Sequence, residues 1–256
     1  MFKYDAPEQL LKGRTILVTG AGDGIGKASA IAYAKAGATV ILAGRTEEKL
    51  EAVYDEIEAL GCQQPAIVPI DFDKATEPDY IELANLLDET FGKLDGILHN
   101  AGILGLRTSI ENYDPIIWEQ VMRVNVNAPF ILTQTLMPLL RESKDASVIF
   151  VTSGVATKGR AYWGAYCVSK FATLGLMETL ADELENDPNI RINAINPGGT
   201  ATAMRAYAYP AEDPSTIATP DDIQPAYLFL MGPDSKGVNG QNIDAQGTLT
   251  AQDFES

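Results

Sequence analysis

The residues that could do chemistry gather between positions 153 and 170 of the sequence. Tyr166 and Lys170 stand four positions apart in a stretch whose apolar residues recur with helical spacing, so both side chains would lie on one helix face. A free tyrosine titrates near about pH 10, but a cation fixed beside it favours the phenolate and lowers its pKa. We therefore expect Tyr166 to act as a general acid or base, with Lys170 lowering its pKa.

Ser153 follows a short apolar run at 148–151 and precedes the tyrosine by thirteen residues. Its hydroxyl could donate a hydrogen bond to the same carbonyl or alkoxide oxygen that Tyr166 protonates. The Tyr-x-x-x-Lys spacing alone remains weak, because an ordinary surface helix would explain it equally well.

The elements that would position these residues alternate along the chain. Apolar runs followed by amphipathic stretches are typical of a parallel sheet with helices on both faces. We expect strands at 15–19, 39–43, 66–70, 96–98, 148–151, 191–195 and 240–244. Helices are expected from the first glycine-rich turn to 36, and at 47–60, 78–91, 115–140, 164–184 and 221–231.

A glycine-rich turn links the first expected strand to its helix. Its sequence is Gly20-Ala21-Gly22-Asp23-Gly24-Ile25-Gly26. Glycines let the backbone approach a pyrophosphate, and the helix N-terminus presents free N–H groups to its charge. Placed between a strand and a helix, the turn predicts a dinucleotide site in preference to a plain tight turn.

The end of the second expected strand would select the coenzyme. A carboxylate there would bind the ribose of NAD, whereas the sequence has Gly44 followed by Arg45, and an arginine can accept the 2′-phosphate of NADP. We therefore expect NADP(H), with NAD(H) less favoured. The alternative is that Arg45 is merely solvated at a helix start.

Three further motifs accompany these residues: His99-Asn100-Ala101-Gly102, Asn125 at 28 residues before Ser153, and Asn196-Pro197-Gly198-Gly199-Thr200. Together with Asp23-Gly24-Ile25-Gly26 they make the chain similar to the short-chain dehydrogenase/reductase family over nearly its whole length, and within it to the YciK-like bacterial oxidoreductases. The resemblance implies an α/β fold: one doubly wound Rossmann domain over residues 1–256, with a seven-stranded parallel sheet in the order 3-2-1-4-5-6-7. Residues 1–12 would be an N-terminal extension.

The resemblance also implies the activity and the roles of the site residues. Hydride would pass between a nicotinamide and a carbonyl or secondary alcohol, with Asn125 completing a proton relay through a water near Lys170. Many NADP-dependent relatives have a basic residue where this chain has Asp23, which opposes the NADP(H) assignment. The implied cofactor contacts are Gly20, Gly22, Asp23, Gly24, Ile25, Gly26, Arg45, Asp71 at the adenine, Asn100, Ala101, Gly102, Tyr166, Lys170, Pro197, Gly198, Thr200 and Thr202.

Residues 203–219 show little periodicity and include Met204 and Tyr207. A long irregular segment is often a functional lid, and this content favours a cover over an apolar substrate, although a plain surface loop would look the same. We expect Met204 and Tyr207 to contact the substrate together with Ser153 and Tyr166.

Composition excludes several classes of protein. A formal charge of −16 argues against nucleic acid or an anionic membrane as partner, and the absence of a long apolar stretch or secretory leader favours a cytoplasmic protein. The one histidine, His99, is expected to be structural, which excludes a histidine-based hydrolase. Two cysteines, Cys62 and Cys167, suggest neither a metal site nor a disulfide.

Two alternatives to the enzyme stay open. A catalytically silent NADP(H)-binding redox sensor would keep the fold, but such proteins usually lose the tyrosine or the lysine. A sugar-nucleotide epimerase would need more chain after Gly240. Apolar residues spread around the helices at 115–140 and 164–184 further predict a homodimer or homotetramer.

Overall fold

Seven strands form one parallel sheet in the order β3-β2-β1-β4-β5-β6-β7, as expected. The computed structural model describes residues 1–254, so the last two residues of the expected 1–256 domain lie outside it. Val, Ile and Leu dominate the central strands, and every residue of β1 and β5 is buried, because helices cover both faces. The strands are β1 (Thr15–Thr19), β2 (Thr39–Gly44), β3 (Ala66–Pro69), β4 (Gly96–His99), β5 (Ala146–Val151), β6 (Ile190–Asn196) and β7 (Asn242–Asp244).

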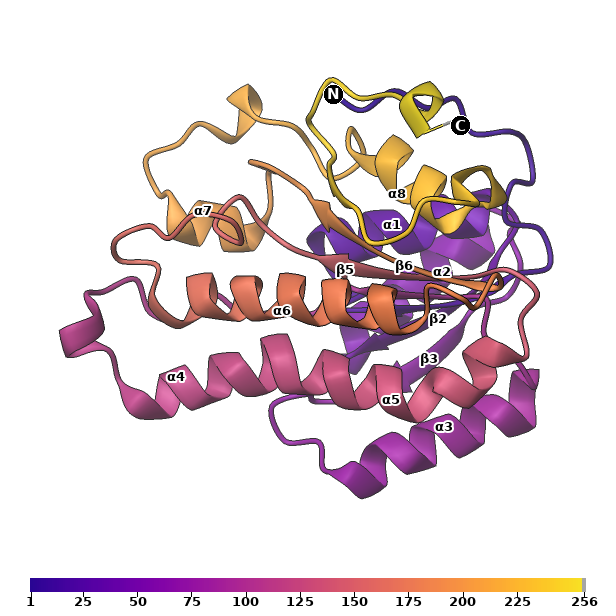
Figure 1. The fold of residues 1–256 in the computed structure, drawn as a ribbon, viewed down its shortest axis with the longest axis horizontal. Coiled ribbons are helices and arrows are strands. Elements are labelled where there is room, and N and C mark those ends of the chain that lie inside the picture. The colour runs from indigo at the N-terminus through magenta and orange to yellow at the C-terminus, as the bar shows by residue number, and fades with distance from the viewer. Residues whose placement is uncertain (255–256) are drawn as a thin grey trace.

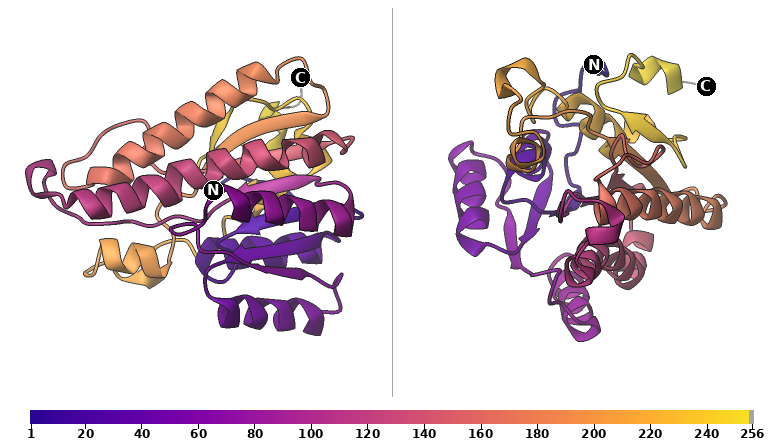
Figure 2. Two further views of the ribbon diagram at one scale, coloured as in Figure 1. Left: turned by 90° about the horizontal axis from the view of Figure 1, so that it is seen from below. Right: turned by 90° about the vertical axis from the view of Figure 1, so that its left-hand side faces the viewer.

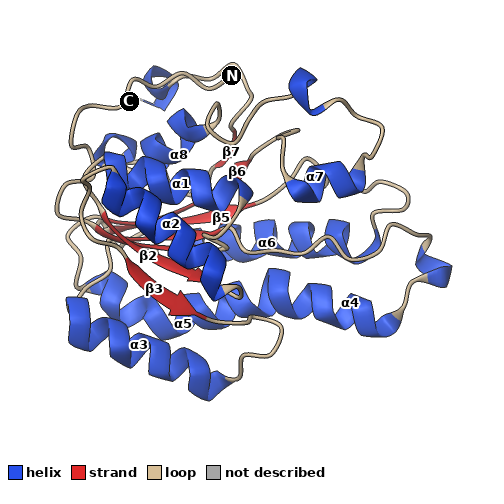
Figure 3. Ribbon diagram, turned by 180° about the vertical axis from the view of Figure 1, so that it is seen from behind, coloured by secondary structure: helices blue, strands red, loops and turns tan. Residues whose placement is uncertain are grey.

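The helices divide into two layers (Figures 1 and 3). On one face, α1 (Gly24–Lys35), α2 (Glu47–Ala59) and α8 (Gln224–Met231) pack around Tyr33, Leu50 and Tyr227. On the other face, α3 (Glu77–Phe91), α5 (Ala128–Arg141) and α6 (Gly164–Glu183) pack around Tyr80, Leu132 and Met177. The two views of Figure 2 show the sheet enclosed between these layers.

The structure differs from the expectation in two places that matter for the site. The helix expected at 115–140 consists of α4 (Pro115–Met122) and α5, joined by a π-helical turn, η2 (Arg123–Asn127), in which the Ala128 N–H donates to the Arg123 carbonyl. Residues 203–219 are not irregular throughout. They contain α7 (Ala203–Ala208) and a 3₁₀ turn, η3 (Pro214–Thr216), with Thr202 capping the N-terminus of α7 by accepting from Arg205 N.

The expected extension at 1–12 packs against the body of the protein. Phe2 and Leu11 are buried, and the Phe2 ring lies 5.4 Å from that of Phe229 on α8. The Phe2 N–H donates to the Ala245 carbonyl, which lies just after β7. The N-terminus therefore lies beside the C-terminal part of the chain, over α8 (Figure 1).

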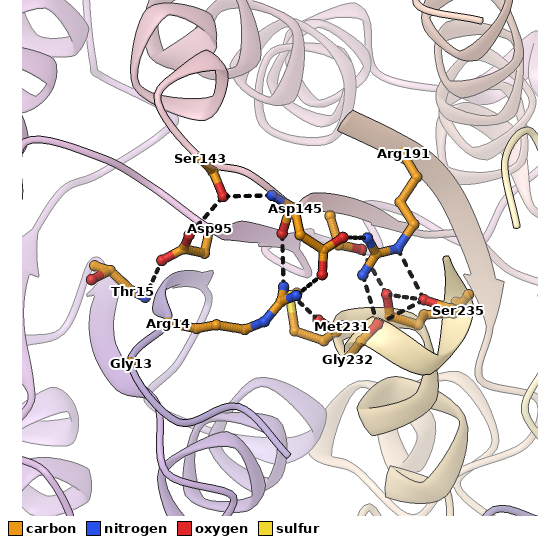
Figure 4. A network of polar contacts seen from close by, with 12 residues as sticks. Gly13, Arg14, Thr15, Asp95, Ser143, Asp145, Arg191, Met231, Gly232 and Ser235 are labelled. Carbon is orange, nitrogen blue, oxygen red and sulfur yellow. Dashed lines mark hydrogen bonds and ion pairs between the residues drawn. The ribbon is translucent and has the colours of Figure 1, made fainter. Parts of the chain in front are cut away.

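The amino ends of the strands are held by a buried polar network (Figure 4). Asp145 pairs with both Arg14 and Arg191, and the Asp95 carboxylate accepts from Thr15 N at 2.9 Å and from Ser143 Oγ at 2.6 Å. Such contacts satisfy charges that would be costly to bury alone. They leave the opposite edge of the sheet, where the strands end, to loops that can form a site.

Within residues 1–254, no helix is both long and apolar enough to cross a bilayer.

Candidate active site

Two adjoining cavities open at the carboxyl ends of the strands, beside the point between β1 and β4 where the strand order reverses. One cavity has a volume of about 470 Å³, and a second of about 270 Å³ adjoins it over the ends of β2 and β3. The first is lined by Gly20, Asp23, Gly24, Ile25, Arg45, Asn100, Ala101, Gly102, Ser153, Tyr166, Lys170, Pro197, Gly198, Thr200, Thr202 and Met204 among the expected residues. Gly22 and Asp71 line the second.

The turn requires glycine because a side chain at some of its positions would collide with the neighbouring backbone. A Cβ at Gly26 would lie 2.1 Å from the Gly20 carbonyl oxygen, so close approach of turn and helix requires glycine there. Asn100 secures the turn, since its Nδ2 donates to the Thr19 carbonyl at 3.1 Å. Gly26 itself lines neither cavity and acts through this packing.

Asp23 has a role that its sequence position does not reveal. Its carboxylate accepts from Gly24 N at 2.7 Å, capping α1, and pairs with Lys49 Nζ at 2.6 Å. The hydrogen bond to Lys49 is the main cause that lowers the pKa of Asp23. The negative charge that opposed an NADP site is therefore compensated by a lysine from α2, and Lys49 lines the smaller cavity together with Arg45.

Tyr166 lines the larger of these two cavities and is 8% exposed. Burial raises its pKa to about 12, and a hydrogen bond with Ser153 acts in the opposite direction. Lys170 does not contribute to this shift, contrary to the expectation that it lowers the pKa of Tyr166. The ammonium lies 5.6 Å from the tyrosine ring centroid and donates instead to the Val151 carbonyl at 2.7 Å.

Lys170 lies on α6, and its buried ammonium reaches the end of β5. Desolvation lowers the pKa of Lys170 to about 8. A buried lysine with one carbonyl partner keeps two of its three donors free. Helical spacing places it beside Tyr166 as expected, so the remaining donors are available within the cavity that both residues line.

Asn125 lies outside the cavity lining, in the π-helical turn. Its side chain accepts from Ile103 N at 2.8 Å and donates to the Ile103 carbonyl at 2.9 Å and to Ser169 Oγ at 3.0 Å. It thus ties the loop after Gly102 to α6, and its amide is engaged with neither Tyr166 nor Lys170.

The part of the cavity beyond Tyr166 has an apolar wall. Leu104, Trp163, Met204 and Ala208 line it, and of these the sequence analysis identified only Met204. Trp163 could have been found, because it precedes Tyr166 by three residues and so shares its helix face. The structure does not bring Tyr207 to the cavity: its side chain is 66% exposed on α7.

His99 is structural, as expected. Its Nε2 lies 2.8 Å from Thr133 Oγ1. Because the Thr133 hydroxyl donates its proton to the Pro129 carbonyl, the same hydroxyl accepts from the Nε2–H of a neutral His99 ring. The ring stacks on Phe150, and burial lowers the pKa of His99 to about 3. In the described part of the chain, no cluster of His, Cys, Asp or Glu could hold a metal ion.

Comparison with known proteins identifies the family of this chain. A family model described as short chain dehydrogenase matches residues 14–213. The chain belongs to the short chain dehydrogenase family. The Escherichia coli oxidoreductase YciK is 50% identical over 243 residues, which are 95% of this chain and 96% of that protein.

Solved structures of short chain dehydrogenases agree. One from Pseudomonas syringae has a TM-score of 0.94 at 56% identity and covers 96% of this chain and 100% of its own. One from Shigella flexneri, complexed with NADP, has a TM-score of 0.92 at 49% identity and covers 94% of this chain and 100% of its own. The chain thus shares its fold with a family of oxidoreductases.

Proposed function

We propose that this chain is an NADP(H)-dependent oxidoreductase that interconverts a carbonyl compound and its secondary alcohol. The observation that carries the proposal is that Ser153, Tyr166 and Lys170 line the same cavity as the glycine turn. The dinucleotide would lie along that turn and under Asn100 to Gly102, with its 2′-phosphate at Arg45 and its nicotinamide near Pro197 to Thr202. When bound, it supplies or accepts the hydride.

The chain's own residues would handle the proton. Ser153 donates a hydrogen bond to the substrate oxygen and polarises the carbonyl, while Tyr166 gives its proton to that oxygen. A pKa of about 12 keeps Tyr166 protonated at neutral pH, which is the form that reduction needs. Lys170, with donors to spare, would hold the cofactor ribose and stabilise the phenolate left behind. Asn125 would maintain the loop that covers this proton path.

Replacement of the tyrosine tests the proposal. Tyr166→Phe should lose at least about 100-fold in turnover while the Kd for NADPH stays nearly unchanged, because only the proton donor is removed. Lys170→Ala should lower both turnover and NADPH affinity. The measurement is NADPH oxidation over a panel of ketones, quinones, steroids and acyl thioesters, with binding followed by NADPH fluorescence.

The same screen separates the proposal from a redox sensor. An enzyme turns over at least one carbonyl class, and the Tyr166→Phe protein does not. NADPH binding without turnover across the whole panel would contradict the enzyme and favour the sensor.

A further inference from the structure

Arg107 is a cation at the edge of the apolar wall that no carboxylate compensates. It lies in the loop between β4 and α4, and no ion pair involves it within residues 1–254. Its guanidinium carbon lies 4.6 Å from the ring centroid of Trp163 and 5.1 Å from that of Tyr209. Its Nη1 donates to the Ala208 carbonyl.

These contacts place the guanidinium beside the catalytic cavity. Trp163 and Ala208 both line that cavity, and the Trp163 ring lies 5.7 Å from the ring of Tyr166. One indole therefore contacts both the catalytic tyrosine and the charged edge. A guanidinium stacked on aromatic rings is held in a fixed plane, and four of its five N–H donors remain after the bond to Ala208.

A second arginine beside Tyr209 is already paired with a carboxylate. Arg205 forms two hydrogen bonds of 2.6 Å to the Glu212 carboxylate and stacks on Tyr209 at 3.8 Å. By contrast, Lys158 and Arg160, which are exposed in the turn before Trp163, have no ion pair in the described chain. Two cations without an ion pair therefore lie in the turn that leads into Trp163, and Arg107 contacts the ring of the same Trp163.

We propose that the substrate carries an oxyanion, a carboxylate or a phosphate, and that Arg107 binds it. A planar fork of donors is the group that recognises such oxyanions, often in a bidentate manner. The inference rests on the proposed function, because it takes the substrate carbonyl to lie at Tyr166. Lys158 and Arg160 raise the local concentration of the anion before it binds.

The apolar wall between Tyr166 and Arg107 determines the shape of this substrate. The carbonyl lies at Tyr166 and the oxyanion beyond Trp163, so the two groups are separated by an apolar segment that packs on Leu104, Trp163 and Met204. A 2-oxo acid, in which carboxylate and carbonyl are adjacent, is too short. The substrate class is an apolar carbonyl compound with a distant anionic end.

Matched substrate pairs test the inference. Oxo acids of increasing chain length are compared with their methyl esters, and 3-oxoacyl thioesters of coenzyme A with the uncharged N-acetylcysteamine thioesters. In the unmodified protein, kcat/KM should favour the charged member of one pair type by about tenfold or more, which corresponds to one charge-assisted hydrogen bond. The pair type that shows the preference identifies carboxylate or phosphate as the anion.

Variants test whether Arg107 causes the preference for charged substrates. Arg107→Met should reduce the charged-to-uncharged ratio to about threefold or less while uncharged substrates keep their rate. Arg107→Lys, which retains the charge without the fork, should fall between. Arg141→Met removes an equal charge at the far end of α5 and should leave the ratio unchanged. Equal losses for charged and uncharged substrates in Arg107→Met would show that Arg107 only clamps α7, and would overturn the inference.

A binding measurement separates this inference from the proposed function. The chain has two tryptophans, so in a Trp118→Phe background Trp163 alone reports by fluorescence. Oxo acids should quench Trp163 in the presence of NADP, and Arg107→Met should weaken that binding about tenfold without affecting the esters. If this holds while no substrate is turned over, the anion site stands and the enzyme proposal fails. If turnover occurs without any preference for charged substrates, the enzyme stands and the anion site fails.

Discussion

The ion pair between Asp23 and Lys49 should decide how well the protein distinguishes NADPH from NADH. The pair is on the surface, with side chains 61% and 55% exposed, so it contributes little to stability. It lies in the cavity that Arg45 also lines, where the 2′-phosphate is proposed to bind. Replacing Lys49 by methionine leaves the Asp23 carboxylate uncompensated next to that phosphate.

The expected magnitude follows from the exposure of the site. Two unit charges about 4 Å apart in water interact by about 1 kcal/mol, which is about fivefold in affinity. Lys49→Met should therefore weaken NADPH binding by about five- to tenfold and NADH binding much less. Asp23→Asn in that background keeps the cap on α1 and should recover most of the loss. Arg45→Ala removes a charge-assisted contact of about 1.5 to 3 kcal/mol and should cost at least about tenfold in NADPH affinity.

Titration of each variant with NADPH and NADH, at low and at high salt, measures these effects. The difference between the coenzymes should shrink as salt rises, because both charges are screened. The reasoning is refuted if Lys49→Met weakens NADH and NADPH equally, or if Asp23→Asn restores nothing. Equal use of NADH and NADPH by the unmodified protein would refute the coenzyme assignment without affecting the catalytic residues.

Three other predictions concern coenzyme, pH and assembly. Gly44→Asp should turn the preference toward NADH, and coenzyme titration checks this. The Leu50 side chain would have to move slightly, because the new Cβ would lie 3.3 Å from it. His99 has a pKa lowered to about 3 by burial, so the unfolded state binds its proton first and stability should fall as the pH drops below about 6.5, by about 2 kcal/mol at pH 5. Urea titrations at pH 5 and 7 measure that loss, and His99→Gln should reduce it. The protein should sediment as a dimer or tetramer through α5 and α6, where Phe130 and Phe171 are 47% and 42% exposed, and Phe171→Glu should shift it toward monomer; a monomeric unmodified protein at micromolar concentration would contradict this.

The sequence was sufficient where local pattern and packing agree. The strand at 15–19 matches β1 residue for residue, because a short run of Val, Ile and Leu between a charged residue and a glycine turn has few other uses. The strand order came from the resemblance to a known family, since the pairing of distant strands leaves no mark in local sequence. The cavity-lining positions carried over by that resemblance also came together, apart from Gly26 and Asn125, which support the site from outside.

Other features depend on contacts that sequence does not encode locally. Lys49 and Asp23 are 26 residues apart and meet only because α2 packs beside the glycine turn. Helix α7 was missed because six residues are too few to show a helical period. The pKa of Tyr166 depends on its burial and on where the Lys170 ammonium lies, and neither can be read from a four-residue spacing.

The π-helical turn at Asn125 sets the angle by which α5 is rotated about the helix axis relative to α4. Each residue of an α-helix turns the chain by about 100°, so one additional residue in a single turn rotates everything after it by about that angle. Val121 of α4 consequently packs toward Ala165 and Tyr113 near the active site, while Leu132 and Leu136 of α5 face the sheet and α3. Deleting Val126 would restore an uninterrupted α-helix and misalign one of the two faces. The number of residues in this turn is therefore part of what positions the site.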